Sequence, residues 1–455
     1  MNDAWDHVSR DGFIKAIQKL NGDARDVDIS GPLEVTWISP ESQGVTSTAL
    51  RVRVPYRVAG EGEDCRTATF FAKCPPKYTI QLDLIRDSKL FYLEWLFFEK
   101  IVPSMLEAAS GRIQPPFPSC YHIDFDGEKG TFYMEDIQES GYRPADPSFC
   151  LNGYDYTHCS IVVRRIGRFH ALGMVAERRS SASWTQLYPV LTKDYIFYAP
   201  GPGDPPTAIG GMIENFPENT KWFASGIEGL PKVAVSSGAL DKVIHGFWTT
   251  FCRLRETPTQ GWCVLSHGDL WENNIMFRYE RGEDGIERPV DAKFYDMQMI
   301  KCCHPAVDLV YFVHQSTGPR FRQKYLGDLV REYYTALSET LQVLGSEPPP
   351  LSLEEFEAEV MEKYKPLGVI GKAFFAPVSM LRDDPVVSSG GENRTEQGLE
   401  DFFKSGNTAL VRDRFGRDPK YREKIQEVVR EFVEMALPNG LDSVDSSPLL
   451  ISEQV

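Results

Sequence analysis

The residues best suited to chemistry gather in the stretch LSHGDLWENN (265–274) and in a later FYD (294–296). Asp269, Asn274 and Asp296 are oxygen donors, which is the ligand type that Mg²⁺ prefers. A phosphoryl-transfer site needs an aspartate that orients a hydroxyl, an asparagine five residues later and a second aspartate further on. Asn274 is the fifth residue after Asp269. An isolated HGD can also be a plain turn, but this spacing favours phosphoryl transfer.

A second pair of charged residues lies in apolar surroundings upstream. Lys73 is the only cation in the strand-like run Thr67–Cys74, where a buried ammonium without a partner is costly. Glu94 falls on the apolar face of a helical pattern over Leu82–Val102. We therefore expect Lys73 and Glu94 to pair. In the plainer alternative, Lys73 reaches water from a strand end and a small helix rotation exposes Glu94.

The elements that must position these residues fall into two groups. Strand patterns dominate from residue 33 to 136, at 33–39, 49–58, 67–74 and 131–134, with one long helix at 82–102 that should end at Pro103. Helical patterns follow at 158–177, 242–256, 322–345, 353–360 and 419–436, interrupted by strands at 262–267, 274–279 and 290–296. This predicts an α+β protein with a small β-rich lobe (1–137), a large helical lobe (138–437) and a flexible tail (438–455).

Composition excludes several classes of protein. The 455 residues include 49 Lys and Arg against 65 Asp and Glu, a net charge of −16, so nucleic acid is an unfavourable partner. The sequence contains no run of 18 apolar residues, so we expect no membrane span. Nine cysteines without C-x-x-C spacing favour reduced thiols and a cytoplasmic location. Without coiled-coil heptads, a monomer or modest dimer is expected.

Several blocks of the sequence together resemble a known family. They are LSHGDLWENNIMFRY, DAKFYDMQ and HPAVDLVYF, with FYLEWLFFEKIVP, FYMEDI and RIGRFHALG upstream. The chain resembles, over about residues 33–341, the ecdysteroid kinase-like (CHK kinase-like) branch of the aminoglycoside phosphotransferase and choline kinase group. The resemblance implies a protein kinase-like fold with ATP bound between the lobes.

The resemblance also implies roles for individual residues. Asp269 becomes the catalytic base, Asn274 and Asp296 the Mg²⁺ ligands, and Lys73 the phosphate-binding lysine held by Glu94. The hinge that meets the adenine is the run containing Met134, Glu135 and Ile137. His267 is a packing residue of the loop, and Asp308 braces that loop from a helix.

Two positions depart from the family pattern. The expected phosphate loop, PESQGVTST (40–48), has the single glycine Gly44, so an anion cradle there would use backbone amides and hydroxyls. A plain hairpin is the alternative. Met297 replaces the usual phenylalanine after Asp296, a change of packing that should preserve the chemistry.

Spacing further predicts a small-molecule acceptor. Only eleven residues (297–307) separate Asp296 from Asp308, which leaves no room for the activation segment of a protein kinase. Candidate linings at 180–229, 311–315 and 374–381 are aromatic and aliphatic, and each could equally be core. They suit a bulky apolar alcohol better than a polycation, and the resemblance adds ecdysteroids and ingested toxins as acceptors.

Two other functions remain compatible with the sequence. A pseudokinase that binds nucleotide or ligand without transfer would explain the glycine-poor loop. A metallohydrolase would use His267, Asp269, His304 and Asp308, although no H-x-H or H-E-x-x-H spacing is present.

Overall fold

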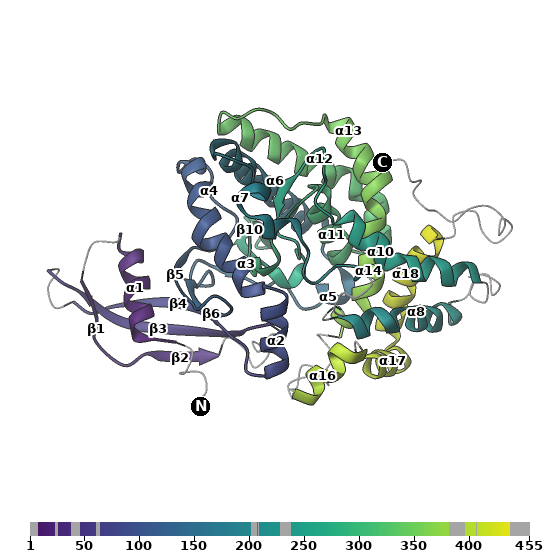
Figure 1. Cartoon of the computed structure of the whole chain (residues 1–455), viewed down its shortest axis with the longest axis horizontal. Coiled ribbons are helices and arrows are strands. Elements are labelled where there is room, and N and C mark those ends of the chain that lie inside the picture. Colours follow the sequence, from purple (N-terminus) through teal and green to yellow (C-terminus); the bar gives the residue numbers. More distant parts are fainter. Residues whose placement is uncertain are drawn as a thin grey trace.

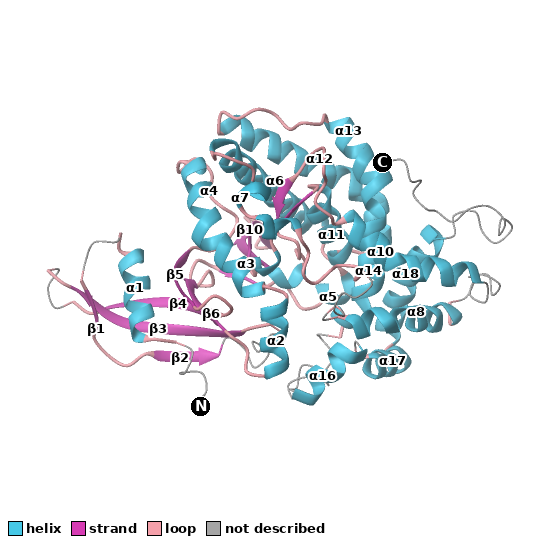
Figure 2. Cartoon of the chain, viewed as in Figure 1, coloured by secondary structure: helices cyan, strands magenta, loops and turns pink. Residues whose placement is uncertain are grey.

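The computed structural model describes residues 8–22, 26–37, 46–60, 64–201, 207, 209–227, 238–381, 396–405 and 407–436. The chain forms a smaller lobe built around a sheet and a larger, mainly helical lobe (Figures 1 and 2). The predicted two-lobed α+β fold is therefore confirmed. The boundaries at residues 137 and 437 stay a prediction, and the tail 438–455 lies outside the described residues. Within the described ranges, no helix is both long enough and apolar enough to cross a membrane.

A six-stranded antiparallel sheet organises the smaller lobe. Its strands are β1 (Val27–Ile29), β2 (Glu34–Trp37), β3 (Thr48–Val58), β4 (Arg66–Cys74), β5 (Cys120–Phe125) and β6 (Gly130–Glu135). The spatial order is β1-β3-β4-β6-β5, and β2 also pairs with β3. Helix α1 (Arg10–Leu20) covers one face, where Phe13 packs on Phe70 and Tyr133. Four of these strands match the predicted ones, whereas β1 and β5 have no counterpart among them.

The long helix expected at 82–102 is broken into segments and does not end at Pro103. Its parts are α2 (Thr79–Asp87), α3 (Leu90–Leu96), the π-helix η2 (Phe97–Ile101) and α4 (Val102–Ala109). Lys89 separates α2 from α3 with a left-handed backbone (φ 54°). A proline ring clashes with the carbonyl four residues earlier in a regular helix. The wider π turn just before Pro103 relieves that clash, so the helix continues past it.

The helical lobe is built around α6 (Tyr156–Arg179) and α12 (Pro319–Val343), which pack on each other. The other helices are α5 (Phe149–Asn152), α7 (Trp184–Leu187), η3 (Pro189–Thr192), α8 (Gly210–Ser225), α10 (Gly238–Leu254), η4 (Glu272–Asn274), η5 (Met297–Met299), α11 (Ala306–Ser316), α13 (Leu353–Ala358), η6 (Glu359–Tyr364), α14 (Lys365–Ser379), α16 (Glu396–Ser405), α17 (Thr408–Arg417) and α18 (Pro419–Ala436). The five predicted helical patterns of this lobe correspond to α6, α10, α12, α13 and α18.

Two small sheets inside this lobe position the HGD loop. Strand β9 (Ile275–Arg281) pairs with β10 (Glu287–Phe294) and with β7 (Tyr142–Arg143). Strand β8 (Val264–Ser266) pairs with β11 (Lys301–Cys303), which is not among the predicted strands. The loop between β8 and β9 carries Asp269 and Asn274, and Asp296 follows the end of β10. Because β9 and β10 are antiparallel neighbours, the start of β9 and the end of β10 lie side by side.

Candidate active site

Lys73 joins the two lobes. It lies near the end of β4, its side chain is only 5 % exposed, and its Nζ donates to Glu94 and to Asp296. These partners are 21 and 223 residues away in the sequence. Burial disfavours the ammonium, but the charges of Asp296 and Glu94 outweigh that cost, so the pKa of Lys73 lies above its usual value. The structure therefore brings together the two residues expected to pair, with Asp296 as a third member.

Glu94 lies on α3 with a side chain only 1 % exposed. Burial raises the pKa of Glu94, while the ammonium of Lys73 opposes that rise. Its Oε1 also accepts a hydrogen bond from the backbone N of Met297 at 3.2 Å. Helix α3 is thereby fixed both to the smaller-lobe sheet and to the segment that carries Asp296.

Asp296 has a left-handed backbone, with φ of 67°. This conformation is uncommon for a residue with a side chain and is often found at functional sites. It turns the chain from β10 into η5, which places the carboxylate against Lys73. The second oxygen, Oδ2, accepts from Gln298 Nε2 at 3.0 Å.

Asp269 and Asn274 contact each other within the HGD loop. Asn274 Nδ2 donates to the backbone oxygen of Asp269 at 2.8 Å. Because this bond uses the amide nitrogen, the side-chain oxygen Oδ1 of Asn274 could serve as a metal ligand. Tyr311 donates its hydroxyl to Asp269 Oδ1 at 3.1 Å. Burial raises the pKa of Asp269, and the neighbouring His267 lowers it. The sequence placed Tyr311 only among candidate lining residues, because no spacing relates it to Asp269.

Asp308, at the start of α11, accepts hydrogen bonds from the backbone of the loop and so braces it, as the resemblance implied. Its two carboxylate oxygens accept from the backbone N of His267 at 2.7 Å and of Gly268 at 3.0 Å. Asp308 also contacts His170 Nε2 at 3.2 Å. His267 bonds through Nε2 to the backbone oxygen of Tyr295 at 3.0 Å. His267 thus connects the loop to the end of β10.

A buried ion cluster also contacts this loop. Arg255 has a fully buried side chain and donates to the backbone oxygen of Gly268 at 2.7 Å and to Asp194 at 2.9 Å. Lys301 contacts the same carboxylate at 3.4 Å. Burial alone would raise the pKa of Asp194, but Lys301 and Arg255 hold it below its usual value. Sequence reasoning missed Arg255 because its partner lies 61 residues away with no motif between them.

The expected hinge is held by two ion pairs. Glu135, the last residue of β6, pairs with Lys293 of β10 at 2.9 Å. Asp136 pairs with Arg51 of β3. Met134 and Ile137 on either side are buried. Gly44 lies outside the described residues, so the structure says nothing of the expected phosphate loop.

The oxygen donors present suit magnesium better than zinc. Asn274 and Asp296 supply an amide and a carboxylate oxygen, and Mg²⁺ typically takes one or two protein ligands together with substrate phosphates. Within the described part of the chain, no three His, Cys, Asp or Glu side chains converge as a metal site. His267 and Asp308 have the partners given above, and His304 stacks on Tyr364 with ring centroids 4.4 Å apart. The metallohydrolase alternative therefore has no geometric support.

Comparison with known families agrees with this geometry. The profile of a family described as the ecdysteroid kinase-like family matches residues 41–346. The chain belongs to the ecdysteroid kinase-like family. The match spans β4, α3, the HGD loop and Asp296, so all the residues gathered at Lys73 fall inside the family region. No curated protein matches the chain.

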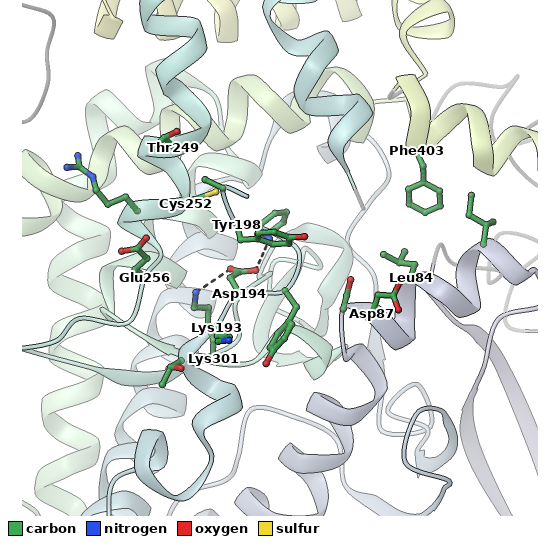
Figure 3. A pocket seen from close by; sticks show the side chains of 17 residues that line it. Leu84, Asp87, Lys193, Asp194, Tyr198, Thr249, Cys252, Glu256, Lys301 and Phe403 are labelled. Carbon is green, nitrogen blue, oxygen red and sulfur yellow. Dashed lines mark hydrogen bonds and ion pairs between the residues drawn. The ribbon is translucent and has the colours of Figure 1, made fainter. Parts of the chain in front are cut away.

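Of the three segments expected to line an acceptor site, one borders a large cavity. Residues 192–195 and 197–199, within the segment 180–229, line a cavity of about 870 Å³ (Figure 3). The other two segments do not border it. Gln315 lines a small separate cavity, and Phe374 lines another.

Proposed function

We propose that this ecdysteroid kinase-like protein transfers the γ-phosphoryl group of ATP to a hydroxyl of a small lipophilic alcohol, with Mg²⁺. The observation that carries the proposal is the contact of Lys73 with both Glu94 and Asp296, beside the loop that holds Asp269 and Asn274. Lys73 is kept charged and immobile by its two carboxylate partners. A fixed cation at this point suits phosphate oxygens, because in phosphoryl transfer positioning and electrostatics provide most of the rate.

Each residue of the site has a separate role in this reaction. Asp269 accepts the hydrogen bond of the acceptor hydroxyl and takes its proton, and Tyr311 holds the orientation of its carboxylate. Asn274 and Asp296 would hold the metal, and Lys73 would contact the phosphates. The backbone of Met134, Glu135 and Ile137 would meet the adenine edge. Mg²⁺ supplies charge neutralisation on the phosphates, and ATP supplies the phosphoryl group.

A pseudokinase of the same fold is the second candidate. It is favoured by the single glycine of the segment 40–48. It is disfavoured by the presence of all four polar residues that phosphoryl transfer needs. Lys73 contacts Asp296, and Asn274 contacts Asp269. The two candidates differ in whether an acceptor stimulates ADP release.

The deciding experiment measures ADP release with MgATP across steroid, choline-like and plant-derived alcohols. Asp269→Asn should lower the acceptor-dependent rate by about 10²–10⁴-fold, because it removes the general base. The control Asp28→Asn, on the edge strand β1, should leave the rate unchanged. ADP release that no alcohol stimulates, together with normal MgATP binding, would favour the pseudokinase. Equal rates in Asp269→Asn and wild type would contradict the proposed role of Asp269.

A further inference from the structure

We propose that Gln298 is a further ligand of the magnesium ion, which it would bind through its side-chain oxygen beside Asp296. The assignment rests on the proposed function, because it requires the metal that phosphoryl transfer uses. Gln298 lies in η5, two residues after Asp296, and is only 6 % exposed. It is not part of the Asp–Asn spacing that predicts the other metal ligands.

The two ends of the Gln298 amide have different surroundings. Its Nε2 donates to Asp296 Oδ2 at 3.0 Å. An ionised carboxylate has no hydrogen to donate, so the end of the amide that faces Asp296 must be the NH₂ group. The other end, Oε1, is buried and has no hydrogen-bond partner among the described residues. Because Nε2 and Oε1 are bonded to the same carbon, this unpaired oxygen lies beside the Asp296 carboxylate.

A buried oxygen without a partner is uncommon in folded proteins, because burial removes the water that would otherwise bind it. Only a hydrogen-bond donor or a cation can compensate for that loss. The adjacent negative charge of Asp296 favours a cation. Amide and carboxylate oxygens suit Mg²⁺, which completes its coordination with phosphate oxygens of the substrate. A set of Asp296 and the two amide oxygens of Asn274 and Gln298 would leave room for those phosphates.

The backbone on both sides of Gln298 is already fixed. The backbone N of Met297 donates to Glu94 Oε1 at 3.2 Å. On the other side, the backbone oxygen of Met299 packs closely against Gly268. Lys73 and Gln298 also approach different oxygens of Asp296, namely Oδ1 and Oδ2. A ligand on such a fixed turn needs little rearrangement to bind a metal.

The test measures binding of Mn²⁺, a paramagnetic substitute for Mg²⁺, to the full chain with a non-hydrolysable ATP analogue. Electron paramagnetic resonance reports the free Mn²⁺, and the analogue without protein gives the reference. Gln298→Met keeps the length of the side chain but lacks the oxygen, so it should weaken Mn²⁺ binding by about tenfold or more. Gln342→Met, at an exposed position of α12, is the matched control and should bind as the wild type does. Thermal unfolding shows whether each variant is folded.

A role limited to holding Asp296 through the NH₂ group is the alternative, and two further variants separate it from ligation. Gln298→Glu keeps an oxygen at the same reach and loses the NH₂ group, whereas Gln298→Asp adds the same charge one methylene short. Gln298→Glu should bind Mn²⁺ at least as tightly as the wild type and about tenfold more tightly than Gln298→Asp. Binding by Gln298→Glu as weak as that of Gln298→Met would overturn the inference. Equal affinities of the Glu and Asp variants would also overturn it, because charge alone would then explain both.

A measurement on the wild type decides the question if a variant does not fold. A crystal structure with Mg²⁺ and the ATP analogue should place Gln298 Oε1 about 2.1 Å from the metal. An Oε1 that instead accepts from a water or a protein donor, outside the coordination shell, would contradict the inference.

Failure of this inference can be told apart from failure of the proposed function. If Asp296→Asn abolishes Mn²⁺ binding while every folded Gln298 variant binds as the wild type does, the metal assignment of Asp296 stands and the inference is wrong. If Mn²⁺ binding depends on Gln298 as expected but no alcohol stimulates ADP release, the inference holds and the proposed kinase function fails. Folded wild-type protein that binds no Mn²⁺ with the analogue would overturn the inference whatever the ADP assay shows.

Discussion

At the scale of single residues, one buried cation faces two carboxylates. Lys73 and Glu94 are both almost fully buried, and each charge would be costly there alone; they are tolerated because Lys73 contacts Glu94 and the partly buried Asp296. Removing Lys73 leaves both carboxylates without their counter-charge. The site is therefore also a stability determinant, and its variants must be interpreted with both effects in mind.

Lys73→Met should lower the free energy of unfolding by about 3–5 kcal/mol, because the buried Glu94 and the partly buried Asp296 then lack a counter-charge. Urea unfolding followed by circular dichroism measures this. The double variant Lys73→Met with Glu94→Gln should recover part of the loss, since one of the two unpaired carboxylates is gone. A double variant that loses as much as the sum of the single variants would show that the residues do not interact.

The Lys73–Glu94 pair was predictable because each charge interrupts an apolar pattern and so needs a partner. Asp269 and Asn274 were predictable from their spacing. Arg255, Asp194 and Tyr311 carry no such signal, because each is one charged or aromatic residue among many. Asp194 follows η3, Arg255 follows α10 and Tyr311 lies on α11, so only the tertiary packing of these segments brings the three together.

At the scale of elements, the HGD loop is fixed between α11 and η5. Asp308 of α11 accepts from two consecutive loop amides, and Gly268 packs against the backbone of η5. Every residue of α11 is buried. Its sequence therefore lacks the alternation of polar and apolar faces by which an amphipathic helix is recognised. For that reason a pattern-based prediction finds α12 but not α11.

Asp308→Asn should destabilise the protein by about 1–3 kcal/mol at pH 7, because a buried loop amide loses its acceptor. Burial would raise the pKa of Asp308, but His170, His267 and the loop amides hold it below its usual 3.8. A carboxyl with a lowered folded pKa stabilises above its unfolded pKa and loses that contribution as pH falls through the folded value. The difference between variant and wild type should hold from pH 7 to about 5 and shrink below about pH 4. Chemical unfolding at several pH values checks this, and a difference that grows on acidification would contradict it.

Gly268→Ala should lower the free energy of unfolding far more than Gly60→Ala, although both glycines have the same backbone φ. Gly268 has φ of 82°, and an added Cβ would lie 2.0 Å from the backbone oxygen of Met299. Gly60 also has φ of 82° but has no atom within 4 Å of such a Cβ. Gly60→Ala should therefore cost only the left-handed backbone, about 1–2 kcal/mol. Thermal unfolding of both variants isolates the clash, and equal losses would show that η5 moves away freely.

At the scale of the whole molecule, the candidate site exists only where the lobes meet. Lys73 and Glu94 come from the smaller lobe, whereas Asp296, Asp269 and Asn274 come from the larger one. The two-lobed division could be read from the sequence, because strand patterns give way to helical ones near residue 137. The contact between the lobes could not, since it depends on side chains 223 residues apart, as for Lys73 and Asp296.

MgATP at 100 times its Kd should stabilise the folded protein by about 2.7 kcal/mol. For a chain of this size that corresponds to a rise of a few degrees in Tm. Chelating the magnesium with EDTA should remove most of the rise, and so should Asp296→Asn. Asp28→Asn on β1 should keep it. An equal rise with ATP in EDTA would exclude Asn274 and Asp296 as the residues through which nucleotide is held.

The π-helical turn η2 has a consequence for comparing this chain with its relatives. A π turn bonds each residue to the one five positions away, so it holds one residue more than the α-helix it interrupts. Any relative whose equivalent helix is regular therefore needs a one-residue gap between positions 97 and 101 when the two sequences are aligned. An ungapped alignment that matches Glu94 correctly would shift every position of α4 by one and would pair its buried residues with exposed ones.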